Sequence, residues 1–168
     1  MATRTLIAAL FLGAVVAACA ATDDPSLSAA QDDAIVKAVQ AAQRCKKDDN
    51  GDDCSITVTV RDNEGGCLVE MEQDQKIVGF RRGERGKAIF WQLDDKTTSR
   101  NFIFTKHGIA IVDDTTPVFY DAQRFNLGKG FRWRNGNPGP GEFYYAVHVK
   151  NTNSSISCSL DPKIRNQS

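Results

Sequence analysis

The stretch Ser55-Ile56-Thr57-Val58-Thr59-Val60-Arg61 decides the expected fold of this chain. Its apolar side chains recur at every second position, which is the period of a β-strand with one buried face. Similar short segments follow it, and glycine, proline or Asx residues separate most of them. We expect these further strands to cover residues 67–72, 76–81, 87–93, 101–105, 109–112, 117–120, 131–134, 142–150 and 155–160.

This succession of short strands predicts a mainly β domain. No helical period lies between the strands, so we expect an antiparallel β-sandwich of the immunoglobulin-like or Greek-key type, or a partly open barrel. A length of 168 residues suits one domain. We place that domain at residues 28–168, after a short polar tether at residues 19–27.

One helix is expected ahead of the sheets, over residues 28–44. Ser28 is a good N-cap residue, and Gln31 stands where a capping box requires it. Apolar residues at helical spacing then form a narrow stripe, which we interpret as a face that docks on the rest of the domain. The stripe consists of Ile35, Val36, Val39 and Ala42.

A turn-forming loop at residues 135–141 predicts a β-hairpin near the C-terminus. The loop is rich in asparagine, glycine and proline. Closing it places Arg132 opposite Tyr144, and opposed side chains share one face of a sheet. Because guanidinium groups hold phosphate or carboxylate bidentately, the basic and aromatic face is a candidate binding surface. Its residues are Arg132, Arg134, Tyr144 and His148.

Five cysteines in a short chain indicate an oxidising compartment. Without Cys19, four remain, and they allow three disulfide pairings between which the sequence cannot choose. We prefer Cys45 with Cys54 and Cys67 with Cys158, because the first pair flanks a short polar loop. The spacings of Cys-x-x-Cys redox sites and of zinc sites are absent.

Residues 1–18 have the character of a signal peptide. An apolar run of 14 residues follows Arg4, and it is shorter than the roughly 20 residues of a transmembrane helix. Val16-Ala17-Ala18-Cys19 resembles the lipobox of bacterial lipoproteins, which implies a diacylated Cys19 at the mature N-terminus. The resemblance also implies an outer-membrane anchor that faces the periplasm, since Ala20-Ala21 lacks an acidic sorting residue. Cleavage after Ala20, which would give a soluble secreted or periplasmic protein, is the alternative.

The charges of the chain are balanced in total but not in place. There are 21 basic and 21 acidic residues, and such a neutral domain is not expected to bind nucleic acid. Residues 19–60 carry eight aspartates against four basic residues, whereas residues 115–168 carry seven basic against three acidic residues. The two ends could pack together, or the basic end could face an anionic partner.

An acidic loop provides a candidate metal site. Carboxylate and amide oxygens on a tight turn suit calcium, and the candidates are Asp48, Asn50, Asp52 and Asp53. However, counted from Asp48, the sixth and twelfth positions of an EF-hand loop would be Asp53 and Thr59 rather than glycine and glutamate. The alternative interpretation of this segment is a solvated loop that binds no metal. We expect the protein to have no cofactor.

We expect a non-enzymatic binding module rather than an enzyme. No Gly-x-Ser-x-Gly motif occurs. Adjacent aspartates on a strand point to opposite faces, so neither Asp94-Asp95 nor Asp113-Asp114 forms a catalytic pair. The expected partners are the membrane, through the lipid anchor, and a protein or polymer of the cell envelope. An inhibitor or immunity lipoprotein is a specific version. The alternatives are a hydrolase acting on peptidoglycan or polysaccharide, and a structural subunit of an envelope complex.

Overall fold

The computed structural model describes residues 27–48, 50–95, 98–112 and 118–167. The predicted signal peptide, Cys19 and all of the predicted tether except Leu27 lie outside these residues. Within the described ranges, no helix is long and apolar enough to cross a membrane.

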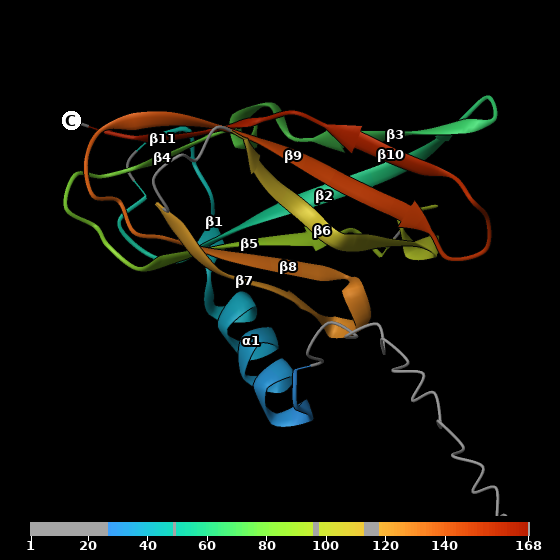
Figure 1. Cartoon of the computed structure of the whole chain (residues 1–168), viewed down its shortest axis with the longest axis horizontal. Helices are drawn as coiled ribbons and strands as arrows, with labels where there is room; N and C mark the ends of the chain where they lie inside the picture. The colour runs from blue at the N-terminus through green and yellow to red at the C-terminus, as the bar shows by residue number, and fades with distance from the viewer. Residues whose placement is uncertain (1–26, 49, 96–97, 113–117, 168) are drawn as a thin grey trace, which may run out of the picture.

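Two β-sheets are stacked face to face, with one helix on the outside (Figure 1). The first sheet contains β1 (Gln43–Arg44), β2 (Cys54–Asn63), β3 (Gly66–Met71), β5 (Lys87–Leu93), β8 (Gly130–Asn135) and β7 (Phe119–Phe125). The second contains β10 (Ser157–Leu160), β9 (Gly141–Asn151), β11 (Lys163–Asn166), β4 (Ile77–Phe80) and β6 (Phe102–Val112). Three short 3-10 helices lie between strands: η1 (Gln73–Gln75), η2 (Thr98–Asn101) and η3 (Asn126–Gly128). The predicted mainly β sandwich with one N-terminal helix is confirmed.

Both sheets mix parallel and antiparallel pairs. The chain leaves the first sheet after β3, adds β4 to the second sheet and returns as β5, so β2 and β5 run in the same direction. The strand β11 likewise runs parallel to β4. The alternation of side chains identifies strands and buried faces, but it does not tell a parallel neighbour from an antiparallel one.

The core lies between the two sheets and is built from alternate residues of each strand. In β2, the predicted buried residues Ile56, Val58 and Val60 are fully buried. The rings of Trp91 and Tyr145 meet edge to face, with centroids 5.3 Å apart, across the two sheets. Burial also raises the pKa of the Tyr145 phenol.

The helix α1 (Ala29–Ala41) covers part of the outer face of the first sheet (Figure 1). Its predicted capping box is present, since the side chains and backbones of Ser28 and Gln31 satisfy each other. The helix ends at Ala41 rather than at Arg44, because Gln43–Arg44 is extended and pairs with β2. The predicted docking face is confirmed: Ile35 and Val39 pack in a second apolar cluster with Ala88, Phe90 and Phe125.

The four cysteines form the preferred disulfides. Cys45 pairs with Cys54, with their Cα atoms 4.8 Å apart, and Cys67 pairs with Cys158, with their Cα atoms 5.9 Å apart. The second bond joins β3 of the first sheet to β10 of the second. It therefore staples one edge of the sandwich, while β7 and β6 are the terminal strands of their sheets at the other edge.

Candidate binding site

The predicted hairpin between residues 131–134 and 142–150 does not form, and that prediction was wrong. The strand β8 pairs with β5 and β7, whereas β9 lies in the other sheet and pairs with β6, β10 and β11. The loop between them crosses from one sheet to the other. The buried amide of Asn135 donates to Asn166 Oδ1 at 2.7 Å, and the Asn137 amide donates to the carbonyl of Arg81 at 2.8 Å. These contacts hold the loop across the end of the sandwich.

The four residues of the predicted binding face are consequently divided between two sheets. Arg132 and Arg134 alternate with the core residues of β8, so they lie on the outer face that α1 partly covers. Tyr144 and His148 alternate with the core residues of β9 and lie on the outer face of the second sheet. The structure does not bring these two pairs together.

Arg132 and Arg134 are engaged within the sheet. Asp121 accepts from both guanidinium groups, at 2.5 Å from Arg132 and 3.3 Å from Arg134. Gln123 accepts from Arg132 at 2.6 Å, and the carbonyl of Gly86 accepts from Arg134 at 2.9 Å. Burial lowers the pKa of Arg132, and the Asp121 charge opposes this effect. Both guanidinium groups share Asp121 and each also bonds to a further acceptor of the first sheet, which is the pattern of a structural network.

On the other sheet, Tyr144 lies under a cation. The Lys163 ammonium is 4.8 Å from the centre of the Tyr144 ring and bonds to Glu142 at 2.9 Å. His148 lines a shallow groove beside Cys158. Glu142 pairs with Lys163 and Arg165 of β11.

The residues of the acidic loop mostly serve the fold. The Asn50 amide donates to the carbonyls of Lys46 and Gly79, both at 2.7 Å. Asp53 accepts from the backbone of Ala88 at 2.8 Å, and Asp52 pairs with Lys87 at 3.1 Å. Asp48 is exposed. Within the described part of the chain, no group of three His, Cys, Asp or Glu side chains is placed to hold a metal ion.

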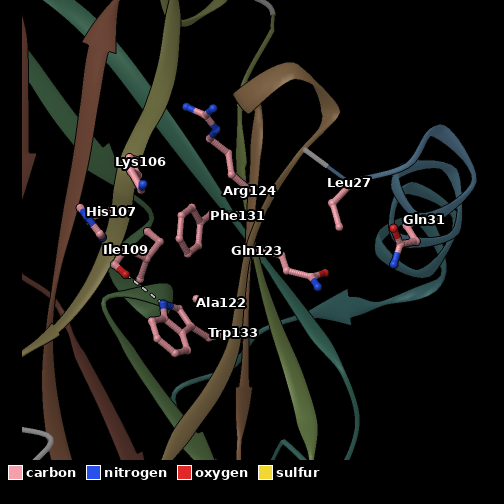
Figure 2. A pocket seen from close by; sticks show the side chains of 10 residues that line it. All are labelled: Leu27, Gln31, Lys106, His107, Ile109, Ala122, Gln123, Arg124, Phe131 and Trp133. Atoms are coloured by element: carbon pink, nitrogen blue, oxygen red, sulfur yellow. Dashed lines mark hydrogen bonds between the residues drawn. The ribbon is translucent and has the colours of Figure 1, made fainter. Parts of the chain in front are cut away.

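A pocket of about 550 Å³ lies at the edge of the sandwich that β6 and β7 form, away from the Cys67–Cys158 disulfide. Figure 2 shows the side chains that line it. We call it the edge pocket. The sequence reasoning did not find it. Its walls come from the start of α1 and from β6, β7 and β8. The lining residues are Leu27, Gln31, Lys106, His107, Ile109, Ala122, Gln123, Arg124, Phe131 and Trp133.

Two bulges shape this edge. The pairing of β6 with β9 shifts between Phe104 and Ile109, and the pairing of β7 with β8 shifts between Tyr120 and Gln123. In the first bulge, a Cβ on Gly108 would lie 2.6 Å from Phe104 Cβ, so glycine is required there. Bulges re-aim side chains and often border functional sites. The strands expected at residues 101–105 and 109–112 are therefore one continuous strand, and His107-Gly108 lies in its bulge.

The floor of the edge pocket is apolar and its rim is cationic. In Figure 2, the Phe131 ring and the Trp133 indole lie between Ile109 and the strands of the first sheet. The indole N–H donates to the Ile109 carbonyl at 2.9 Å, which fixes the ring across the two sheets. Lys106 and Arg124 lie above this floor, and the Arg124 guanidinium donates to the Phe104 carbonyl at 3.4 Å.

Among the described residues that line the edge pocket, none is acidic.

Comparison of the sequence with protein families and with curated proteins finds no match to either. The chemistry of the pocket is therefore inferred from its side chains. An aromatic floor beside a lysine, an arginine and a histidine suits an apolar group that lies next to a carboxylate or another anion.

Proposed function

We propose that the protein is a lipid-anchored, non-enzymatic binding module of the bacterial envelope, which recognises an anionic segment of another envelope protein in the edge pocket. The observation that carries the proposal is the combination of Lys106 and Arg124 with an aromatic floor and no acidic lining residue among those described. The address rests on the resemblance of residues 16–19 to a lipobox. Cys19 would hold the domain at the outer membrane, on the periplasmic side.

The position of the edge pocket favours a protein ligand. Its volume of about 550 Å³ lies within the range of ligand sites, and it is bordered by β6 and β7, the terminal strands of their sheets. A terminal strand can offer backbone groups to an extended peptide, and pockets beside it can take alternate side chains. An extended segment with an apolar side chain next to an acidic one fits this arrangement.

Cross-linking in living cells tests the proposal directly. A photoreactive amino acid replaces Ala122, an exposed residue that lines the edge pocket. We expect it to give a protease-sensitive adduct of defined mass. The matched control carries the same group at Leu68, which is 47% exposed on β3, and should give no such adduct. Adducts with glycan alone, or the same adducts from both positions, would contradict recognition of a protein at this site.

Reversing a charge at the rim provides the quantitative prediction. Arg124→Glu should lower the yield of the Ala122 adduct about tenfold, because it replaces attraction with repulsion toward an anionic ligand. Arg82→Glu reverses an exposed charge on the β4–β5 connection and should leave the yield unchanged. The yield of the adduct should also fall when cross-linking is carried out in about 0.5 M salt, because salt screens exposed charges. Equal yields in the two variants would exclude the rim cation from recognition.

A further inference from the structure

We propose that the η3 turn, with Leu127 at its tip, contacts the membrane and places one leucine among the headgroups of an anionic bilayer. The inference rests on the proposed lipid anchor at Cys19, because that anchor keeps the domain close to a membrane. It concerns a surface that adjoins the edge pocket and shares Arg124 with its rim, whereas Leu127 is not among the lining residues of that pocket.

Leu127 is the most exposed large apolar side chain in the described part of the chain. It is 93% exposed, whereas the next most exposed, Tyr144, is 49% exposed. Its backbone is also unusual, because Asn126, Leu127 and Gly128 all have positive φ, at 50°, 52° and 86°. A leucine in this region is strained. Within the domain, the side chain has almost no apolar contact that would offset the strain, so an apolar surface outside the domain is the natural partner.

The turn that presents Leu127 is firmly held. The Asn126 N–H donates to Asp32 of α1 at 2.7 Å, and the Lys129 N–H donates to the Asn126 carbonyl at 2.9 Å. The Lys129 ammonium donates to the carbonyls of Arg100 and Phe102 at 2.5 and 2.6 Å, which ties the turn to the neighbouring η2. Leu127 therefore stands on a fixed tip and cannot fold back onto the core without breaking these bonds.

The charges around the turn favour an anionic surface. Arg100 and Arg124 are exposed; Lys129 Nζ bonds to the Arg100 carbonyl, and a Cβ on Gly128 would lie 3.5 Å from Arg124 Cδ. Two acidic groups lie nearby: Asp32 accepts the backbone bond described above, and Asp95 interacts with Lys129. Exposed cations beside an apolar side chain are the usual composition of a surface that lies on anionic lipid.

The η3 turn is also at the end of the domain where the chain begins. Leu27 packs against the cluster that contains Phe125, the residue directly before the turn. Only seven residues of sequence lie between Cys19 and Leu27, and the eight residue-to-residue steps of a fully extended chain span at most about 26–29 Å. An acylated Cys19 would thus keep this end of the domain within reach of the bilayer surface.

Depth-dependent quenching tests the inference on the acylated protein. Leu127→Cys introduces a thiol into a chain whose four described cysteines are in disulfides. The thiol carries an NBD fluorophore, and the protein is reconstituted in phosphatidylethanolamine–phosphatidylglycerol vesicles that contain nitroxide lipids. The matched control is Leu68→Cys, on a strand far from η3 in Figure 1. We expect quenching to be about threefold stronger at position 127, as for a side chain at the headgroup–acyl boundary.

Each outcome has one meaning. Equal quenching at the two positions, in protein whose N-terminal peptide carries the acyl mass, would overturn the membrane contact and leave the anchor intact. An N-terminal peptide without acyl groups would overturn the anchor, and the membrane contact with it. Leu127→Gly should unfold at the same or a higher temperature than the parent, because glycine accepts positive φ without strain. A marked loss of stability would instead show that Leu127 serves the fold, which would also overturn the inference.

Discussion

Removal of the Cys67–Cys158 disulfide should lower the free energy of unfolding by about 4–5 kcal/mol, the value that the chain-entropy model gives for a loop of this size. The bond closes a sequence separation of 91 residues and is the covalent link between β3 and β10 of opposite sheets. Without it, the unfolded chain gains conformational freedom while the folded sheets keep most of their contacts. Urea unfolding of a Cys67→Ala/Cys158→Ala variant, compared with the parent, measures the difference.

The other disulfide is the internal control for this prediction. Cys45 and Cys54 have a sequence separation of only nine, so the same model gives a loss of about 2.5 kcal/mol for Cys45→Ala/Cys54→Ala. Both cysteines of this pair are fully buried, and alanine fills part of the space they leave. A larger loss from this pair than from the Cys67–Cys158 pair would show that burial, rather than loop closure, dominates the contribution of the disulfides.

The sequence was informative where local chemistry decides the structure. The alternation at residues 55–61 predicted a buried strand face, and Ile56, Val58 and Val60 are fully buried. The capping box at Ser28 and the apolar stripe of the helix were also found as expected. The capping box joins residues that are close in sequence. The buried faces of the strand and the helix follow from the spacing of their apolar residues alone, without knowledge of the segments that pack on them.

The sequence failed where a choice between distant partners was required. The loop at residues 135–141 has strong turn chemistry, and a hairpin is its simplest local interpretation. The structure instead uses it to cross between sheets, because β9 finds three other partners and the buried Asn135 bonds to Asn166. The strand β11 (Lys163–Asn166) was missed, since its pairing with β4 and β9 depends on segments far away in sequence.

The edge pocket was missed for a related reason. Residues 101–105 and 109–112 were predicted as two strands around a turn, whereas they form the single strand β6 with a bulge. The local signal, a glycine after His107, is shared by turns and bulges. Only the three-dimensional structure shows that a second bulge, on β7, borders the same pocket from the other sheet.

Gly130→Ala should lower the free energy of unfolding by about 2–3 kcal/mol, as overpacking of a tight contact does. A Cβ at Gly130 would lie 2.2 Å from the Phe125 ring, which covers this glycine from the neighbouring strand. The ring cannot move without leaving the cluster through which Ile35 and Val39 attach α1 to the first sheet. We therefore expect the variant to loosen the helix as well as to unfold earlier in urea.

Hydrogen exchange separates this mechanism from a general defect of the strand. Amides of α1 should lose protection in Gly130→Ala, while those of β9, in the other sheet, should keep most of theirs. The matched control is Gly139→Ala, since a Cβ there meets no atom within 4 Å among the described residues and its φ is not positive. At an ordinary strand position, alanine stabilises the folded protein relative to glycine, because alanine loses less conformational entropy on folding. A neutral or stabilising effect at Gly130 would therefore show that the Phe125 ring can shift at little cost, and that α1 does not depend on its present position.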